Sequence, residues 1–214
     1  MSRCGTFGPW PEFSCKPRAV AFDRSTKLLP SMSVSHLNTK RLIDYWRSRA
    51  GEGRMPDRRA IDPTHFPKLL SQVFVAGRED AGLYPFRLVG GFIAELHGQD
   101  LRQQNVLNLF RHQDRLDLKG ALEAGRRRPE PVLVQADIIT EGPSLPIEIL
   151  FLPLAPAPGS PERFLGFYQP LGMVARLQGL PALEIAVGRV INMGPANEEA
   201  PRLRLAALDG RRIA

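Results

Sequence analysis

The chain has 214 residues and a formal net charge of +7, with 43% hydrophobic and 24% charged residues. This composition is ordinary for a soluble globular protein and leaves room for one domain of about 100–150 residues with flanking segments. Cys4 and Cys15 are the only cysteines, which excludes a disulfide-rich scaffold and leaves a zinc site without enough ligands. Neither a secretory signal nor a run of about 18 apolar residues is present, so we expect a cytoplasmic protein without membrane insertion.

The positive charge raises nucleic-acid binding as an alternative function. Arg126, Arg127 and Arg128 form the densest basic run, and clustered cations release counterions when they bind phosphates. Elsewhere Lys and Arg are interleaved with Asp and Glu, which is typical of a mixed surface that keeps a protein in solution. Cations at a helix end also complement the helix dipole. A basic nucleic-acid-binding adaptor is therefore kept only as the alternative.

Residues 1–35 contain several prolines and no sustained period of 2 or 3.6 residues. Such a segment is typical of a disordered tail. Met32 stands just before the first helical pattern, so the second interpretation is a start at this residue, with residues 1–31 not translated.

The first predicted helix begins at Ser35 or Asn38, either of which can cap it, and ends at Gly51. Tyr45 and Trp46 lie on its apolar face. Aromatic side chains are enriched at protein contacts, so these two residues are interface candidates for a partner protein or for a second copy of the chain. The alternative is that Trp46 packs against the sheet of its own chain.

Five later segments have the period-2 pattern or the β-rich composition of strands. They are residues 72–76, 84–89, 132–140, 146–154 and 163–171. Their connections favour antiparallel pairing, because a parallel crossover needs a dozen or more residues. Short helical stretches near residues 92–96 and 106–110, and a longer helix over residues 114–125, separate the second strand from the third. Gly120 inside this longer helix indicates a close approach to the sheet, since glycine costs about 1 kcal/mol relative to alanine there.

These elements predict an α+β fold, in which a five-stranded antiparallel sheet carries helices on one face and has an N-terminal flanking helix. We assign residues 36–176 to this domain. Residues 177–214 are a C-terminal extension, which is either a docking segment or a partly disordered tail.

Seven short motifs accompany the predicted elements. They are Tyr45-Trp46, Pro56-x-Arg58-Arg59-x-x-Asp62-Pro63, Leu69-Leu70-x-x-Val73-Phe74, Phe86-Arg87-Leu88-x-Gly90, Glu95-Leu96-x-Gly98, Asp114-Arg115 and Glu148-x-Leu150-x-Leu152-Pro153-Leu154. In this order, over residues 38–172, they resemble the PAS domain family, and more narrowly a bacterial branch in which one PAS domain forms most of the protein. The resemblance implies a sensory or protein-interaction module that is coupled to signalling and has no fixed cofactor.

The sequence offers little chemistry for catalysis or for a bound metal. The histidines are too scattered for a metal cluster, and they are His36, His65, His97 and His112. His97 or His112 could serve as a haem ligand, but a histidine near a helix end is more typically solvated or paired with the dipole. A flavin photosensor of the resembled family would need a reactive cysteine in the helical region, and this chain has none there. We expect no enzymatic activity, no cofactor and no metal.

An apolar ligand cavity, if present, should be lined by the inward sides of strands and short helices. The candidates are Phe86, Leu88, Ile93, Leu96, Leu107, Phe110, Phe151 and Phe167. Arg87 and Glu148 are a polar pair inside apolar strands. They lie either at the cavity wall, where they would fix a polar group of a ligand, or in an ion pair or on the other face of the sheet.

The sequence thus predicts a non-enzymatic PAS-like regulatory module in bacterial signalling. Such a module would sense a small apolar ligand, mediate protein–protein contacts, or do both, and a homodimer is one form that such contacts take.

Overall fold

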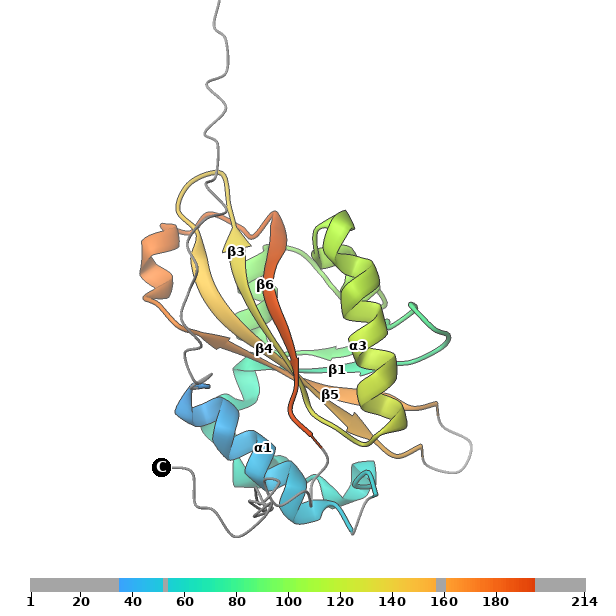
Figure 1. The fold of residues 1–214 in the computed structure, drawn as a ribbon. Helices are drawn as coiled ribbons and strands as arrows, with labels where there is room; N and C mark the ends of the chain where they lie inside the picture. Colours follow the sequence, from blue (N-terminus) through green and yellow to red (C-terminus); the bar gives the residue numbers. More distant parts are fainter. Residues whose placement is uncertain (1–34, 52–53, 157–160, 195–214) are drawn as a thin grey trace, which may run out of the picture. The chain divides into compact units, whose positions relative to one another are not determined.

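The computed structural model describes residues 35–51, 54–156 and 161–194 (Figure 1). Its strands form one antiparallel sheet in the order β2-β1-β5-β4-β3-β6. The strands are β1 (Val73–Gly77), β2 (Phe86–Val89), β3 (Val132–Ile139), β4 (Leu145–Leu154), β5 (Arg163–Pro170) and β6 (Glu184–Asn192). The α-helices are α1 (Leu37–Arg49), α2 (Gly91–His97) and α3 (Arg115–Arg127). The 3-10 helices are η1 (Arg58–Ala60), η2 (Pro63–His65), η3 (Pro67–Gln72), η4 (Val106–Leu109), η5 (His112–Asp114) and η6 (Val174–Leu177).

The predicted α+β class, the antiparallel sheet and the N-terminal helix are confirmed, but the sheet has six strands rather than five. The sixth strand, β6, lies within residues 177–214, which the sequence analysis assigned to a C-terminal extension. It pairs with β3 over its whole length, from Ile139 opposite Glu184 to Val132 opposite Asn192. The sheet therefore continues beyond residue 176. The predictions for residues 1–34, including the start at Met32, lie outside the described residues.

Helix α1 begins one residue after its cap, His36. The Nδ1 atom of His36 accepts a hydrogen bond from the backbone N–H of Asn38 at 3.2 Å, so the cap is neither Ser35 nor Asn38. Residues at positions i, i+3, i+4 and i+7 of α1 are buried, which is the spacing of one helical face. They are Thr39, Leu42, Ile43 and Trp46.

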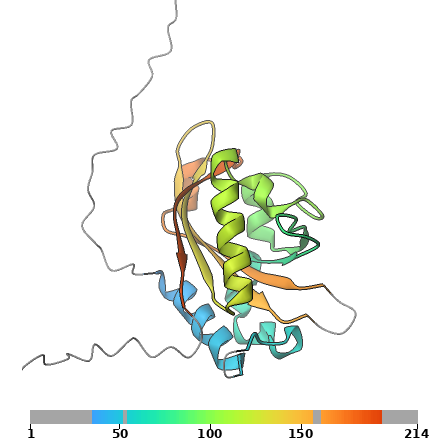
Figure 2. The same ribbon diagram turned by 45° about the vertical axis from the view of Figure 1, so that its right-hand side comes forward.

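Alternation along the strands divides the core into two clusters, one on each face of the sheet. We call the face covered by α2, η4 and α3 the inner face, and the face covered by α1 the outer face. In β4, Ile149 and Phe151 belong to the inner cluster, whereas Leu150 and Leu152 belong to the outer cluster with Trp46. Figure 2 shows the sheet with α3 against it and α1 at one end. The helices predicted for a single face thus cover one face, and the flanking helix packs against the other.

In α3, a different glycine from the expected one lies close to the sheet. A Cβ atom on Gly125 would lie 2.6 Å from Cγ2 of Val132 and 2.8 Å from the carbonyl oxygen of Glu130. Gly120 is exposed and has open space where its Cβ would be. The helix therefore approaches β3 at Gly125, and the interpretation of Gly120 was wrong.

The described helices are short in comparison with a membrane span. The longest, α1 and α3, have 13 residues each, and none of the helices described is both long and apolar enough to cross a bilayer.

Candidate functional site

Aromatic side chains fill the middle of the inner face. The ring of Phe74 makes edge-to-face contacts with Phe86, Phe151 and Tyr168, with centroids 5.3, 5.5 and 5.7 Å apart. Gly166 lies opposite Phe74 in the neighbouring strand, and a Cβ atom on it would lie 1.9 Å from Cζ of the ring. Glycine at this position therefore makes room for the ring, and the ring occupies the centre of the inner face.

The structure does not bring the eight predicted pocket residues together. Six of them are buried in the inner cluster, with exposed fractions of 6% or less, and they are Phe86, Ile93, Leu96, Leu107, Phe110 and Phe151. Phe167 is buried in the outer cluster instead. Leu88 is 50% exposed and also lines a groove on the outer face.

Arg87 and Glu148 do not form a pair, because β1 and β5 lie between their strands. Arg87 is bound by Glu79 and donates a hydrogen bond to Oε1 of Gln103 at 2.8 Å. Glu148 is buried on the outer face, where its Oε2 accepts hydrogen bonds from α1 and its cap. Both residues therefore have separate structural partners.

Trp46 packs against its own sheet, as in the second interpretation of the sequence. It is fully buried, and its Nε1–H donates to the carbonyl oxygen of Pro153 at 2.9 Å. Tyr45 is partly exposed. Its hydroxyl accepts a hydrogen bond from the backbone N–H of Asp62 at 2.8 Å, which ties α1 to the segment that follows it.

Two buried polar atoms of the inner face have no hydrogen-bond partner among the described residues. They are Nε2 of His97 and the hydroxyl of Tyr168, whose rings lie 6.1 Å apart. Burial lowers the pKa of His97 to about 4 and raises the pKa of Tyr168. His97 is therefore neutral at physiological pH.

An ion-pair network joins the end of α3 to the sheet. Glu123 accepts hydrogen bonds from Arg78 at 2.8 Å and from the hydroxyl of Tyr84 at 2.7 Å, and Arg126 donates to Glu162 at 2.9 Å. Burial alone would raise the pKa of Glu123, but these hydrogen bonds and the charges of Arg78 and Arg126 lower it to about 2.

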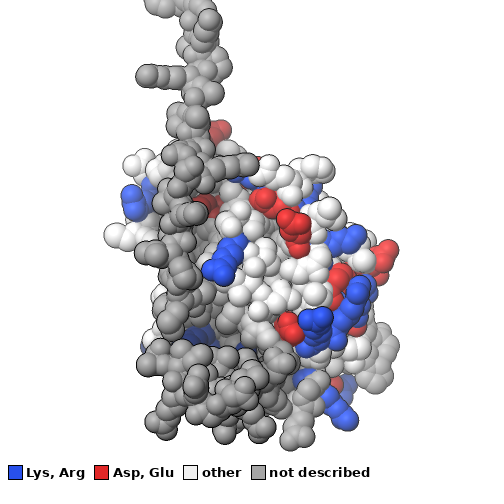
Figure 3. Space-filling model, viewed as in Figure 1, with Lys and Arg blue, Asp and Glu red and all other residues white. Residues whose placement is uncertain are grey.

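This network bears on the nucleic-acid alternative, because it engages Arg126 from the basic run. Only Arg127 and Arg128 of that run are exposed. On the face shown in Figure 3, Lys and Arg side chains lie beside Asp and Glu side chains rather than in one basic field. Among the described residues, no group of three or more His, Cys, Asp or Glu side chains is placed to hold a metal ion.

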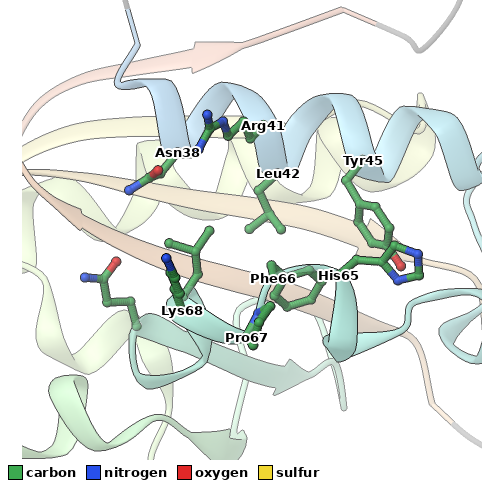
Figure 4. A pocket seen from close by; sticks show the side chains of 10 residues that line it. Asn38, Arg41, Leu42, Tyr45, His65, Phe66, Pro67 and Lys68 are labelled. Carbon is green, nitrogen blue, oxygen red and sulfur yellow. The ribbon is translucent and has the colours of Figure 1, made fainter.

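Two hollows lie on the outer face, on either side of Phe66. The first, which we call the helix groove, has a volume of about 470 Å³ and lies between α1 and residues 65–72. Figure 4 shows Leu42 and Tyr45 pointing from α1 toward Phe66 and His65. The helix groove is lined by Asn38, Arg41, Leu42, Tyr45, His65, Phe66, Pro67, Lys68, Leu69 and Gln72.

The second hollow, which we call the sheet groove, has a volume of about 560 Å³ and is almost entirely apolar. It lies over β1, β2 and the ends of β4 and β5. Its lining residues are Arg58, Ile61, Pro63, Phe66, Leu70, Val73, Val75, Leu88, Val89, Leu154 and Leu165. Phe66 lines both grooves, so the two hollows share one wall.

Residues 58–72 form this shared wall, and the sequence analysis did not include them in a site. Their prolines, Pro63 and Pro67, each stand at the start of a 3-10 helix, and Asp62 caps the first of these by accepting a hydrogen bond from Thr64 at 2.9 Å. Phe66, Leu69 and Leu70 between and after the prolines were the available signal. They have the i, i+3, i+4 spacing of one helical face, and they lie at the start of and within the 3-10 helix η3, where they line the two grooves.

These features together define a small α+β domain, with helices inserted between the second and third strands. A family model described as PAS domain matches residues 34–169, which is more than half of the chain. The chain therefore belongs to the PAS domain family. PAS domains are sensory and regulatory modules that commonly bind small ligands and mediate protein contacts, and this general role applies here.

Several solved structures are similar to part of the chain, and two of them are LOV proteins. One is a single-substitution variant of RsLOV, with 21% identity over 53% of this chain and 72% of that chain, and a TM-score of 0.37. The other is the LOV protein of Rhodobacter sphaeroides, with 15% identity over 55% of this chain and 72% of that chain, and a TM-score of 0.38. No curated protein matches the chain in sequence.

Proposed function

We propose that this PAS domain is a non-enzymatic regulatory module of bacterial signalling that receives a small apolar ligand on the outer face of its sheet and passes the signal on by protein contact. The observation that carries this proposal is the distribution of open space. The rings around Phe74 fill the middle of the inner face, whereas two hollows with mainly apolar linings lie on the outer face, beside Phe66. A further hollow of about 650 Å³ lies beside α2, but its lining carries the charged side chains of Glu95, Asp100 and Arg102, which suit an apolar ligand less well.

The sheet groove has the properties of a small-molecule site. Its volume lies within the range of about 300–1,000 Å³ that is usual for ligand pockets, and its lining is apolar. Leu70 and Leu88 at its rim are 40% and 50% exposed, although large aliphatic side chains are usually buried. A ligand that covers them removes this apolar surface from water.

The helix groove suits the output of the module. Its lining includes Tyr45, Phe66 and Arg41, and aromatic residues and arginine are enriched at protein contacts. Because Phe66 lines both grooves, a ligand that moves its ring changes the shape of the helix groove as well. The contact in this proposal is with a cytoplasmic protein partner, and a second copy of the chain is the first partner to test.

The test of the proposed site compares two exposed leucines on different faces. Leu88→Glu places a charge at the rim of the sheet groove, whereas Leu116→Glu places the same charge on α3, where Leu116 is 74% exposed. We expect the first substitution to abolish calorimetric binding of decanol, an uncharged aliphatic probe, and the second to leave it unchanged. Equal binding by both variants would show that the probe binds elsewhere and would contradict the proposal.

A further inference from the structure

We propose that the sheet groove binds an amphipathic carboxylate, with its aliphatic body on the apolar floor and its carboxylate group held by Arg58 and Arg163. This inference rests on the proposed function, because it names the class of ligand for the same groove. It depends on observations beyond the shape of the groove, namely the placement and the partners of three arginines at one of its ends.

The strand register places Arg163 at the end of the groove. Arg163 lies between Gly77 in β1 and Leu154 in β4, and Leu154 lines the groove. Leu165 also lines the groove, and it is two residues further along β5. Because side chains two residues apart in a strand point to the same face, Arg163 lies on the outer face, beside the apolar floor.

Arg58 reaches the same end of the groove from η1 and belongs to its lining. The chain around it is fixed in two ways. The side chain of Asp57 caps η1 by accepting a hydrogen bond from the backbone N–H of Arg59 at 2.7 Å. The backbone N–H of Ala155, just after β4, donates to the carbonyl oxygen of Pro56 at 3.0 Å. Arg58 is therefore held beside the end of β4, where Arg163 also lies.

Arg87, the third arginine, crosses the sheet at Gly77. A Cβ atom on Gly77 would lie 2.9 Å from Nε of Arg87, so glycine leaves the space that this side chain uses. Glu79 neutralises the charge of Arg87. Within residues 35–51, 54–156 and 161–194, by contrast, neither Arg58 nor Arg163 has a carboxylate oxygen within 4.0 Å.

Arg163 is also short of a hydrogen-bond acceptor. Its Nε is buried and has no partner among the described residues. Burial and the charges of Arg58 and Arg87 lower the pKa of Arg163. The positive charge of Arg163 is therefore disfavoured where it stands, and a negative charge beside it would be stabilising. A buried cationic group without a carboxylate partner is costly, and a carboxylate at this end of the groove supplies the compensating charge.

The floor of the groove determines the rest of the ligand. Among the described lining residues, Arg58 is the only charged one, and most of the others are aliphatic side chains such as Val75, Leu88 and Leu165. An aliphatic body buries its surface on such a floor, whereas a second polar group along the body would lose its water without gaining a partner. The ligand is therefore an anion at one end only.

The experiment compares calorimetric binding of decanoate and decanol to the full chain. We expect decanoate to bind about tenfold more tightly, because a hydrogen bond to a charged group contributes about that factor. Arg58→Gln and Arg163→Gln should each remove most of this difference, so that each variant binds decanoate about as tightly as it binds decanol. Arg127→Gln is the matched control, since Arg127 is an exposed arginine on α3. Arg58 is also exposed, so its variant keeps the test valid if substitution of Arg163 disturbs folding.

Equal affinities for decanoate and decanol would overturn the anion preference while leaving the apolar groove in place. Equal weakening by Arg58→Gln and Arg127→Gln would also overturn it, since it would show a general effect of net charge. Binding to phosphatidylglycerol vesicles without binding to decanoate would replace the free ligand with a membrane surface. Absence of binding by either probe would instead contradict the proposed function itself.

Discussion

Glu148, in the middle of β4, accepts a hydrogen bond of 2.7 Å from the hydroxyl of Thr39 on α1. The same carboxylate oxygen accepts a second bond from the backbone N–H of His36 at 3.0 Å. A buried carboxylate is thereby satisfied by the first turn of the flanking helix, where the partial positive charge of the helix lies. This contact fixes the start of α1 on the outer face and so positions one wall of the helix groove.

We predict that Thr39→Val destabilises the domain by about 1.5–3 kcal/mol, because it removes a hydrogen bond to a buried charged group. The substitution keeps the shape of the side chain, so packing changes little. Urea unfolding measures the loss. Ser48→Ala is the control, since among the described residues this exposed hydroxyl bonds only the carbonyl oxygen of Tyr45, and its removal should cost under about 0.5 kcal/mol. Equal losses for the two variants would show that Glu148 does not depend on Thr39.

The two buried tyrosines of the inner face should respond in opposite ways to loss of their hydroxyl groups. Tyr84→Phe removes a bond to Glu123 and should cost about 1.5–3 kcal/mol. Tyr168→Phe removes a hydroxyl that has no partner among the described residues, so stability should stay unchanged or increase. Thermal unfolding of both variants measures the two changes in stability. A large loss of stability in Tyr168→Phe would contradict the prediction and indicate that a partner binds the hydroxyl of Tyr168.

The two glycines of α3 provide a second matched pair. Gly120→Ala should stabilise the protein by about 0.5–1 kcal/mol, since the position is exposed and helical and has room for a Cβ atom. Gly125→Ala should destabilise it by about 1–3 kcal/mol through the clash with Val132 and Glu130. Chemical denaturation of the two variants tests the packing of α3 on β3. Stabilisation by Gly125→Ala would mean that the helix lies further from the strand.

His97 should make stability depend on pH. Its folded-state pKa of about 4 lies below the value of 6.5 for a free histidine, so the unfolded chain binds more protons between these two values. Stability is therefore full above pH 6.5 and falls as the pH drops toward 4, by about 3 kcal/mol in total. The variant His97→Phe should lose this part of the pH dependence. Parallel pH profiles of the two proteins from unfolding titrations would contradict the assignment to His97.

Much of the fold could be predicted from the sequence because local patterns determine it. The five predicted strands agree with the observed ones to within a few residues, since alternation and turn residues mark them. Strand β6 was missed because it is an edge strand with mostly half-buried and exposed residues, so its alternation is weak. Its partner, β3, is about fifty residues earlier in the chain, and sequence patterns carry no such long-range pairing.

The candidate site was less predictable than the fold. The pocket residues were chosen by hydrophobicity, which does not distinguish the two faces of a sheet whose strands are buried on both sides, as β4 and β5 are. Phe167 was therefore placed with Phe151, although they lie on opposite faces. The sequence also could not predict that Arg58 and Arg163 lie at the same end of the sheet groove. They are brought close by the pairing of β5 with β4 and by the position of η1 beside the end of β4.

The most direct test of the central claim, that recognition takes place on the outer face, is a two-dimensional amide NMR titration of the full chain with decanol. The account predicts that shift changes concentrate at residues 58–75 and at Leu88, Leu154 and Leu165, which surround the sheet groove. Changes concentrated instead around Phe86, Phe110 and Phe151 would show that the inner face opens to the ligand, and would contradict the account.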